Sequence, residues 1–194
     1  TYRYLANFSP ATIMVKTEEP DYSALPTKEY DWANSVYGNV KVDDPEGIPE
    51  PLGKWVTVTT YVDANLLHDM ITGRSVTGIL QFLNKTPVDW YSKKQGSVET
   101  ATYGSEFMAS RTCVEQVLDL QLTLRYLGVP LRDQSYMFGD NEAVVNSSTK
   151  FDAKLHKRHS ALSFHRVREA IAAKIIRYYH LAGEYNPADV VSKH

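Results

Sequence analysis

The sequence predicts an α/β fold with a five-stranded mixed sheet flanked by helices and an extended N-terminal connector. Residues 54–63 alternate apolar and hydroxyl side chains and end on Asp63, a pattern typical of a central strand. The later segments follow in the order strand, strand, helix, strand, helices, strand, helix. Strand–helix–strand steps favour parallel crossovers and short connections favour antiparallel pairs, so we expect both kinds of pairing.

The first three strands are expected at residues 54–63, 75–84 and 88–94. Turn residues separate them, at 68–74 and again at 84–87. Short connections between similar runs predict an antiparallel meander.

The hydrophobic period then changes to that of a helix. Residues 100–127 predict a long amphipathic helix that ends before Gly128 and Pro130. Four more elements are expected, a strand at 135–139, helices at 141–148 and 160–173, and a strand at 175–181. A terminal helix is expected to open with Asn186 as N-cap and Pro187 at the first helical position.

Residues 1–53 differ from the rest because they hold six of the nine prolines and show little periodicity. We interpret them as a connector and residues 54–194 as the folded domain. The aromatic side chains of Tyr30, Trp32 and Tyr37 favour a connector that wraps onto a neighbouring surface. A loose tail fits the composition equally well.

Length and composition limit the class of protein. The 194 residues are 43% hydrophobic, enough for one packed domain. No apolar run approaches the roughly 20 residues that a membrane span needs, and the N-terminus does not look like a signal peptide. Since the chain does not begin with Met, we expect it to be a piece of a longer polyprotein. The single cysteine, Cys113, excludes an internal disulfide and is expected to be a buried structural thiol in a reducing compartment.

Four acids occupy positions at which they could meet. Asp63 and Asp140 each end a predicted strand, and these strands can be neighbours in a mixed sheet. Glu106 lies early in the long helix and Asp189 early in the last one. Such a cluster would repel itself unless divalent cations neutralise it, and carboxylate oxygens suit Mg²⁺ or Mn²⁺. Taken singly, each acid is more often a cap or a surface charge.

The chain resembles the ribonuclease H domain of copia-type (Pseudoviridae) LTR-retrotransposon polyproteins. The motifs that carry the resemblance include Tyr-Val-Asp-Ala-Asn at residues 61–65 and Asn-Pro-Ala-Asp at residues 186–189. The others lie at residues 72–78, 90–95, 103–109, 139–141, 158–159 and 164–169. The match is continuous from about residue 53 to the end, and the first 50 residues more weakly resemble the connector that follows reverse transcriptase.

The resemblance implies that Asp63, Glu106, Asp140 and Asp189 hold two Mg²⁺ or Mn²⁺ ions and are the catalytic acids. It implies hydrolysis of the RNA strand in RNA–DNA hybrids, leaving 3′-hydroxyl and 5′-phosphate ends. The implied partners are the hybrid and the reverse transcriptase domain of the same polyprotein, with no membrane, and the implied location is cytoplasmic, within virus-like particles. Many relatives read Thr-Glu-Ala-Glu-Tyr where this chain reads Thr-Tyr-Gly-Ser-Glu-Phe, at residues 102–107. Glu106 is the acid retained from that motif, and Glu99 is the less favoured alternative for its role. No histidine is assigned to product release, because the segment before Asp189 is short and His180 is expected to end a strand.

Several polar residues are candidate substrate contacts, although strand ends, caps and solvated surfaces explain them equally or better. They are Asn65, Lys93, Lys94, Gln95, Asn141, Lys157 and Arg158. The lysines, the arginine and Gln95 could contact backbone phosphates, while Asn65 and Asn141 could orient a metal-bound water or a ribose hydroxyl. His156, His159 and His165 do not match a zinc pattern and are expected to be structural or phosphate-facing.

Two other functions remain open from the sequence. A noncatalytic ribonuclease-H-like module could support a polymerase, but such a module has no need to keep all four acids. A nuclease of the same fold could act on duplex DNA, as integrases do. The early-helix position of Glu106 favours the ribonuclease H interpretation, since integrase-like sites usually take their last acid from a late helix.

Overall fold

The computed structural model describes residues 14–27, 30–66, 71–132, 134–155 and 157–193. The strands are β1 (Val58–Asn65), β2 (Val76–Leu83), β3 (Thr86–Lys94), β4 (Ser135–Gly139) and β5 (Ile176–His180). The α-helices are α2 (Thr102–Tyr126), α3 (Glu142–Thr149), α4 (Ala161–Ala172) and α5 (Asp189–Ser192). Single 3₁₀ turns lie at η1 (Trp32–Asn34), η2 (Arg158–Ser160) and η3 (Gly183–Tyr185). Among these described residues, no helix is long and apolar enough to cross a membrane.

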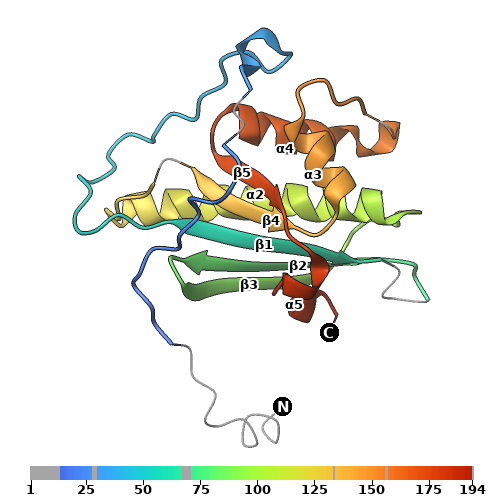
Figure 1. Ribbon diagram of the computed structural model, residues 1–194, viewed down its shortest axis with the longest axis horizontal. Coiled ribbons are helices and arrows are strands. Elements are labelled where there is room, and N and C mark those ends of the chain that lie inside the picture. Colours follow the sequence, from blue (N-terminus) through green and yellow to red (C-terminus); the bar gives the residue numbers. More distant parts are fainter. Residues whose placement is uncertain (1–13, 28–29, 67–70, 133, 156, 194) are drawn as a thin grey trace, which may run out of the picture.

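The strands form one mixed sheet in the order β3-β2-β1-β4-β5 (Figure 1). β1 pairs antiparallel with β2, and β2 with β3, whereas β4 is parallel to both β1 and β5. The expected mixed sheet and its antiparallel meander are therefore confirmed. β1 lies at the centre, as its β-branched sequence predicts.

Most predicted element boundaries agree with the structure to within two residues, and two others need correction at the segments that carry acids. β1 begins at Val58 rather than at residue 54, because of the preceding residues only Val56 forms an isolated bridge, to Leu131. The last helix begins at Asp189, and Asn186 instead ends η3. The Asn186 side chain donates to the Val62 carbonyl (2.9 Å) and accepts from the Ala188 N–H (3.1 Å), which holds residues 186–188 in a turn.

The hydrophobic core lies between one face of the sheet and the helices. Val62, Ile79 and Met137 contribute from the strands, and all three are fully buried. Phe107 and Val114 of α2 are equally buried, and α2 packs against β1 and α4. Cys113 of the same helix is also fully buried, as predicted, and burial raises the pKa of its thiol.

The N-terminal segment crosses the opposite face of the sheet. Met137 points into the core, so its neighbours Tyr136 and Phe138 point the other way. The Tyr22 ring packs on both, with ring centroids 4.3 Å from Tyr136 and 5.6 Å from Phe138. The Tyr22 hydroxyl also lies 3.0 Å from Thr59 Oγ1 of β1.

A second anchor of this segment is Trp32, which is only 7% exposed. The Arg168 guanidinium lies 4.8 Å from the Trp32 ring centroid and donates to the carbonyls of Ser147, Lys150 and Phe151. Farther along, the Tyr37 hydroxyl lies 2.7 Å from His165 Nδ1. Of the two interpretations left open by the sequence, the described part of the segment agrees with the connector that wraps onto a surface.

We predict that this segment contributes to the stability of the domain. Trp32→Ala should lower the free energy of unfolding by roughly 3 kcal/mol, because it removes a buried ring and the cation–π contact with Arg168. Chemical denaturation measures this change. Val36→Ala in the same segment is the control, since Val36 is 87% exposed and should be nearly neutral. Equal stability of the two variants would contradict the prediction.

Candidate active site

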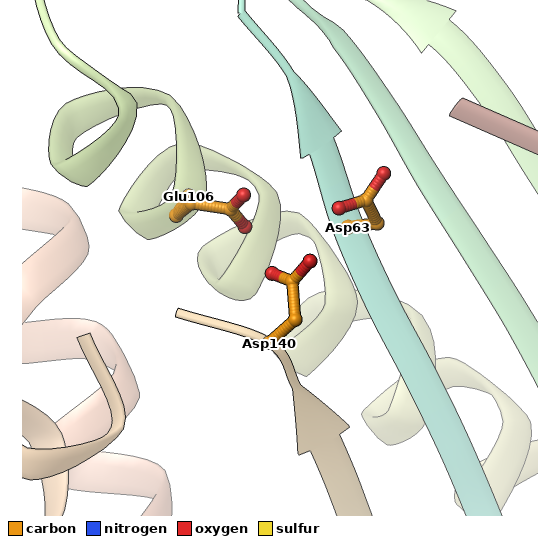
Figure 2. A group of neighbouring side chains, drawn as sticks. All are labelled: Asp63, Glu106 and Asp140. Carbon is orange, nitrogen blue, oxygen red and sulfur yellow. The ribbon is translucent and has the colours of Figure 1, made fainter. Parts of the chain in front are cut away.

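Three of the four predicted acids meet at one end of the sheet. Asp63 lies near the end of β1, Glu106 in the second turn of α2, and Asp140 directly after β4. Each offers a carboxylate oxygen, and these oxygens all lie within 4.8 Å of one another. Figure 2 shows the three side chains converging from the two neighbouring strands and the helix.

The pairing of β1 with β4 explains why the two aspartates meet. The strands are parallel, and Val62 is in register with Gly139. Asp63 is the next residue of β1, and Asp140 is the first residue after β4. The two acids therefore lie at the same end of the two strands. Because backbone hydrogen bonds hold both strands, the separation of the two carboxylates is set by the ladder.

Glu106 reaches this edge because α2 packs along β1. The adjacent Phe107 is fully buried in the core, and Glu106 itself is 6% exposed. The Glu106 carboxylate accepts a hydrogen bond from the backbone N–H of Ala64, the residue after Asp63. Helix packing therefore places this acid against the strand end.

Burial and mutual repulsion change the acidity of the cluster. The pKa of Glu106 is raised from 4.5 to about 9, first by burial and then by the charges of Asp140 and Asp63. The pKa of Asp140 is raised from 3.8 to about 6, again first by burial and then by the charge of Asp63. Without a cation, Glu106 therefore retains its proton at neutral pH, whereas Asp140 takes up a proton only toward pH 6.

These residues fit a divalent metal ion. All the donor atoms are carboxylate oxygens, the ligands that hard cations such as Mg²⁺ and Mn²⁺ prefer. Two of the three side chains are buried, and both burial and the neighbouring carboxylates oppose ionisation of Glu106 and Asp140, so the cluster is short of positive charge. A cation would supply that missing positive charge.

Asp189 lies beside this group of three rather than within it. It is the first residue of α5, and its side chain is 38% exposed. Its carboxylate forms an ion pair with Lys193, one turn later, at 2.5 Å. The Asp189 charge still contributes to raising the pKa of Asp140, so the fourth acid is close to the others.

Two further contacts of α5 were not predicted. Ser192 Oγ donates a hydrogen bond to Asp63 Oδ2, and Lys193 pairs with Asp189. The only signal in the sequence is spacing, because these residues follow Asp189 by three and four positions, which is one helical turn.

The candidate substrate contacts occupy different environments. Lys93 and Lys94 are exposed at the end of β3. Gln95, by contrast, is 6% exposed, and its Nε2 donates to Thr77 Oγ1 (3.0 Å) and to the Ser105 carbonyl (2.8 Å). The prediction of Gln95 as a surface phosphate contact is therefore wrong, since its amide joins β2 to α2.

The other candidates lie at element ends. Asn141 is the N-cap of α3, where its Oδ1 accepts from the Val144 N–H at 3.2 Å. Asn65 is the partly exposed last residue of β1. Arg158 is exposed at the start of η2, and Lys157 precedes it.

The described histidines have protein partners of their own. His159 Nε2 lies 3.0 Å from the carboxylate of Glu99, which is 7% exposed. His165 pairs with Tyr37, and His180 ends β5 as expected, with its Nε2 3.1 Å from the Asp140 carbonyl oxygen. His156 lies outside the described residues. The structure thus brings Glu106, and not Glu99, to the other acids.

We predict that the metal-free protein loses stability as pH rises. The folded-state pKa of Glu106 is about 9 against an ordinary 4.5, so the folded state binds the proton more tightly. This stabilisation is complete below pH 4.5 and is lost progressively up to pH 9, at about 1.4 kcal/mol for each pH unit. In EDTA, Glu106→Gln should therefore raise the melting temperature at pH 8 and change it little at pH 5.

The control for this measurement is Glu115→Gln on the same helix. Arg166 lowers the pKa of Glu115, so this carboxyl is ionised throughout the same pH range. The effect of Glu115→Gln on the melting temperature should be the same at pH 5 and pH 8. A Glu106→Gln effect that is equally independent of pH would count against the proposed protonation of Glu106.

The chain has sequence relatives among retrotransposon polyproteins. It is 25% identical over 134 residues to the Retrovirus-related Pol polyprotein from transposon TNT 1-94 of Nicotiana tabacum, covering 69% of this chain and 10% of that protein. It is 22% identical over 193 residues to the corresponding polyprotein from transposon RE2 of Arabidopsis thaliana, covering 98% and 13%. The chain thus spans only about a tenth of the length of these relatives. No family model matches it.

Several solved structures with the same fold are RNase H domains. The N-terminal RNase H domain of a Mycobacterium tuberculosis protein matches with a TM-score of 0.52 at 15% identity, covering 71% of this chain and 91% of that one. RNase H1 of Halobacterium salinarum gives 0.52 at 13% identity, covering 72% and 95%. LC11-RNase H1, solved in complex with an RNA/DNA hybrid, gives 0.51 at 16% identity, covering 70% and 92%. The chain is a homologue of copia-type retrotransposon Pol polyproteins and has the fold of RNase H domains.

Proposed function

We propose that this chain is a divalent-metal-dependent ribonuclease H that hydrolyses the RNA strand of RNA–DNA hybrids during retrotransposon reverse transcription. The observation that carries the proposal is the convergence of Asp63, Glu106 and Asp140, with carboxylate oxygens within 4.8 Å of one another. The RNase H fold and the Pol polyprotein relatives support the same function.

In this proposal Asp63, Glu106, Asp140 and Asp189 hold two Mg²⁺ or Mn²⁺ ions. When bound, such ions activate a water molecule and stabilise the attacking and leaving oxygens of a phosphodiester displacement. Asp63, Glu106 and Asp140 are brought together by the fold. Asp189 is the fourth proposed ligand, and its ion pair with Lys193 competes with that role.

The protonation of Glu106 and Asp140 also determines whether the proposed site can bind a cation. Glu106 and Asp140 must lose their protons before their oxygens can act as ligands, and both pKa values are raised. Metal binding and proton release are therefore coupled in this site. The products are proposed to carry 3′-hydroxyl and 5′-phosphate ends.

Four basic side chains are the proposed contacts to the hybrid backbone. Lys93 and Lys94 end β3, close in sequence to the start of α2, and Lys157 and Arg158 lie at η2, which packs near α2. Phosphate contacts of this kind supply most of the affinity that does not depend on sequence. Asn65, two residues after Asp63, and Asn141, directly after Asp140, are proposed to contact a ribose hydroxyl or a metal-bound water. The solved complex of LC11-RNase H1 with a hybrid supports this class of substrate.

The polyprotein relatives support a wider context for the chain. We propose the reverse transcriptase domain of the same polyprotein as a partner, with residues 1–53 as the connector to it and residues 54–194 as the ribonuclease H domain. The proposed location is the cytoplasm, within virus-like particles.

Cleavage of labelled duplexes tests the function. With Mg²⁺ or Mn²⁺, the chain should cut the RNA strand of an RNA–DNA hybrid and leave duplex DNA intact. Asp140→Asn should lower kcat by more than the roughly 100-fold that outer-shell substitutions reach. Asp119→Asn is the control, because Asp119 is an exposed acid farther along α2.

Each alternative function has its own outcome. Retained hybrid cleavage in Asp140→Asn would contradict the catalytic role proposed for Asp140. Cutting of duplex DNA in preference to the hybrid would indicate the DNA-specific nuclease. Absence of cleavage and of metal binding would indicate the noncatalytic module.

We also predict that millimolar Mg²⁺ raises the melting temperature relative to EDTA. The ion binds the folded acid cluster and relieves its repulsion, and a concentration of about 100 times Kd stabilises the folded state by about 2.7 kcal/mol. Differential scanning fluorimetry measures the shift. Asp140→Asn should show a smaller shift, and an unchanged wild-type melting curve would argue against a preformed metal site.

A further inference from the structure

We infer that Ser192 is a positioning residue that orients the Asp63 carboxylate for metal binding, and this inference rests on the proposed metal-dependent function. Ser192 is the last residue of α5 and is fully buried. Its Oγ donates to Asp63 Oδ2, and Asp63 is itself only 5% exposed. The contact is therefore shielded from water on both sides.

Two acceptors compete for the Ser192 hydroxyl proton. Besides the Asp63 carboxylate, the Asp189 carbonyl oxygen lies 3.1 Å from Ser192 Oγ. A hydroxyl donates only one proton, and a hydrogen bond to a charged acceptor is about twice as strong as one to a neutral acceptor. The proton is therefore expected on the side of Asp63 whenever that acid is ionised.

This hydrogen bond has a geometric consequence for Asp63. The terminal torsion of an aspartate is broad, so a free carboxylate has no fixed orientation. Figure 2 shows one oxygen of Asp63 directed toward Glu106 and Asp140 and the other directed away from them. A donor fixed at Oδ2 restricts that torsion and keeps the remaining acceptor positions available to a cation.

Gly78 is the feature that lets Ser192 approach. It is the direct cross-strand neighbour of Asp63 in the pairing of β1 with β2. A Cβ atom at this position would lie 2.7 Å from the Ser192 backbone nitrogen and 2.8 Å from the Ala188 carbonyl oxygen. Any larger residue would push α5 away from the sheet, and Ser192 away from Asp63.

The residues that precede α5 are also fixed beside Asp63. Asn186 is 4% exposed, and its Nδ2 donates to the carbonyl of Val62, the residue before Asp63. Residues 186–192 are thus tied to β1 at one end and seated over Gly78 at the other. Only a rigid support of this kind can keep a single hydroxyl aimed at one carboxylate oxygen.

Mn²⁺ binding without nucleic acid tests the inference. Isothermal titration calorimetry should give a Kd for Ser192→Ala that is roughly 10- to 100-fold weaker than that of the wild type, the range seen when outer-shell partners are removed. Titrations are run well below both melting temperatures, which are measured separately in EDTA. Ser148→Ala is the matched control, since Ser148 is a fully buried helical serine whose hydroxyl donates to the Val144 carbonyl within α3. Its Mn²⁺ affinity should equal that of the wild type.

Ser192→Cys provides a second variant should the alanine variant fail to fold. The thiol keeps the bulk of the side chain but is a weak donor, so the Kd should again rise. Unchanged Mn²⁺ affinity in a folded Ser192 variant, with or without a lower melting temperature, would overturn the inference and leave the proposed function intact. No Mn²⁺ binding by the wild type would overturn the proposed function itself, and the inference with it.

Discussion

The fold holds three carboxyl groups close together although burial and mutual repulsion both oppose their ionisation. Two unit charges about 4 Å apart repel by about 4 kcal/mol at an effective dielectric constant of about 20, a large share of the stability of a typical domain. The cluster persists in the fold because Asp63 and Asp140 leave neighbouring strands of one parallel ladder. Neither carboxylate can move far without breaking backbone hydrogen bonds.

The hydrophobic core offsets this repulsion at the third acid. Glu106 is followed directly by Phe107, which is fully buried, and Val114 and Val117 anchor the same helix. Burying large apolar side chains stabilises by about 1.5–3 kcal/mol each, so α2 stays on β1 although it carries a carboxyl toward two others. Burial, and then the charges of Asp140 and Asp63, raise the pKa of Glu106 to about 9, so this carboxyl keeps its proton at neutral pH.

The face of the sheet that points away from the hydrophobic core is covered by the N-terminal segment and by α5. Tyr22 of the N-terminal segment covers Tyr136 and Phe138, and α5 lies over Gly78. The N-terminal segment contributes packing far from the acids, whereas α5 reaches them through Ser192. In the part of the chain that the structure describes, only α5 of the two segments on this face contacts the acid cluster.

The types of the elements and most of the acid cluster could be predicted from the sequence alone. β4 was predicted with its observed bounds, and two acid-terminated strands that can be neighbours in a mixed sheet indicated that Asp63 and Asp140 could meet. Alternation and helical periodicity are local patterns that persist in the folded chain. They also identified Cys113 as a buried thiol.

The contacts of the remaining polar residues depend on how the elements pack, which the local sequence does not specify. Gln95 is buried between β2 and α2, Asp189 pairs with Lys193, and Asn186 bonds to β1 rather than capping a helix. The contact of Ser192 with Asp63 spans 129 residues of sequence. This contact depends on how closely α5 approaches the sheet. The close approach is possible because Gly78, on β2, has no Cβ atom, and no local pattern near residue 192 encodes that fact.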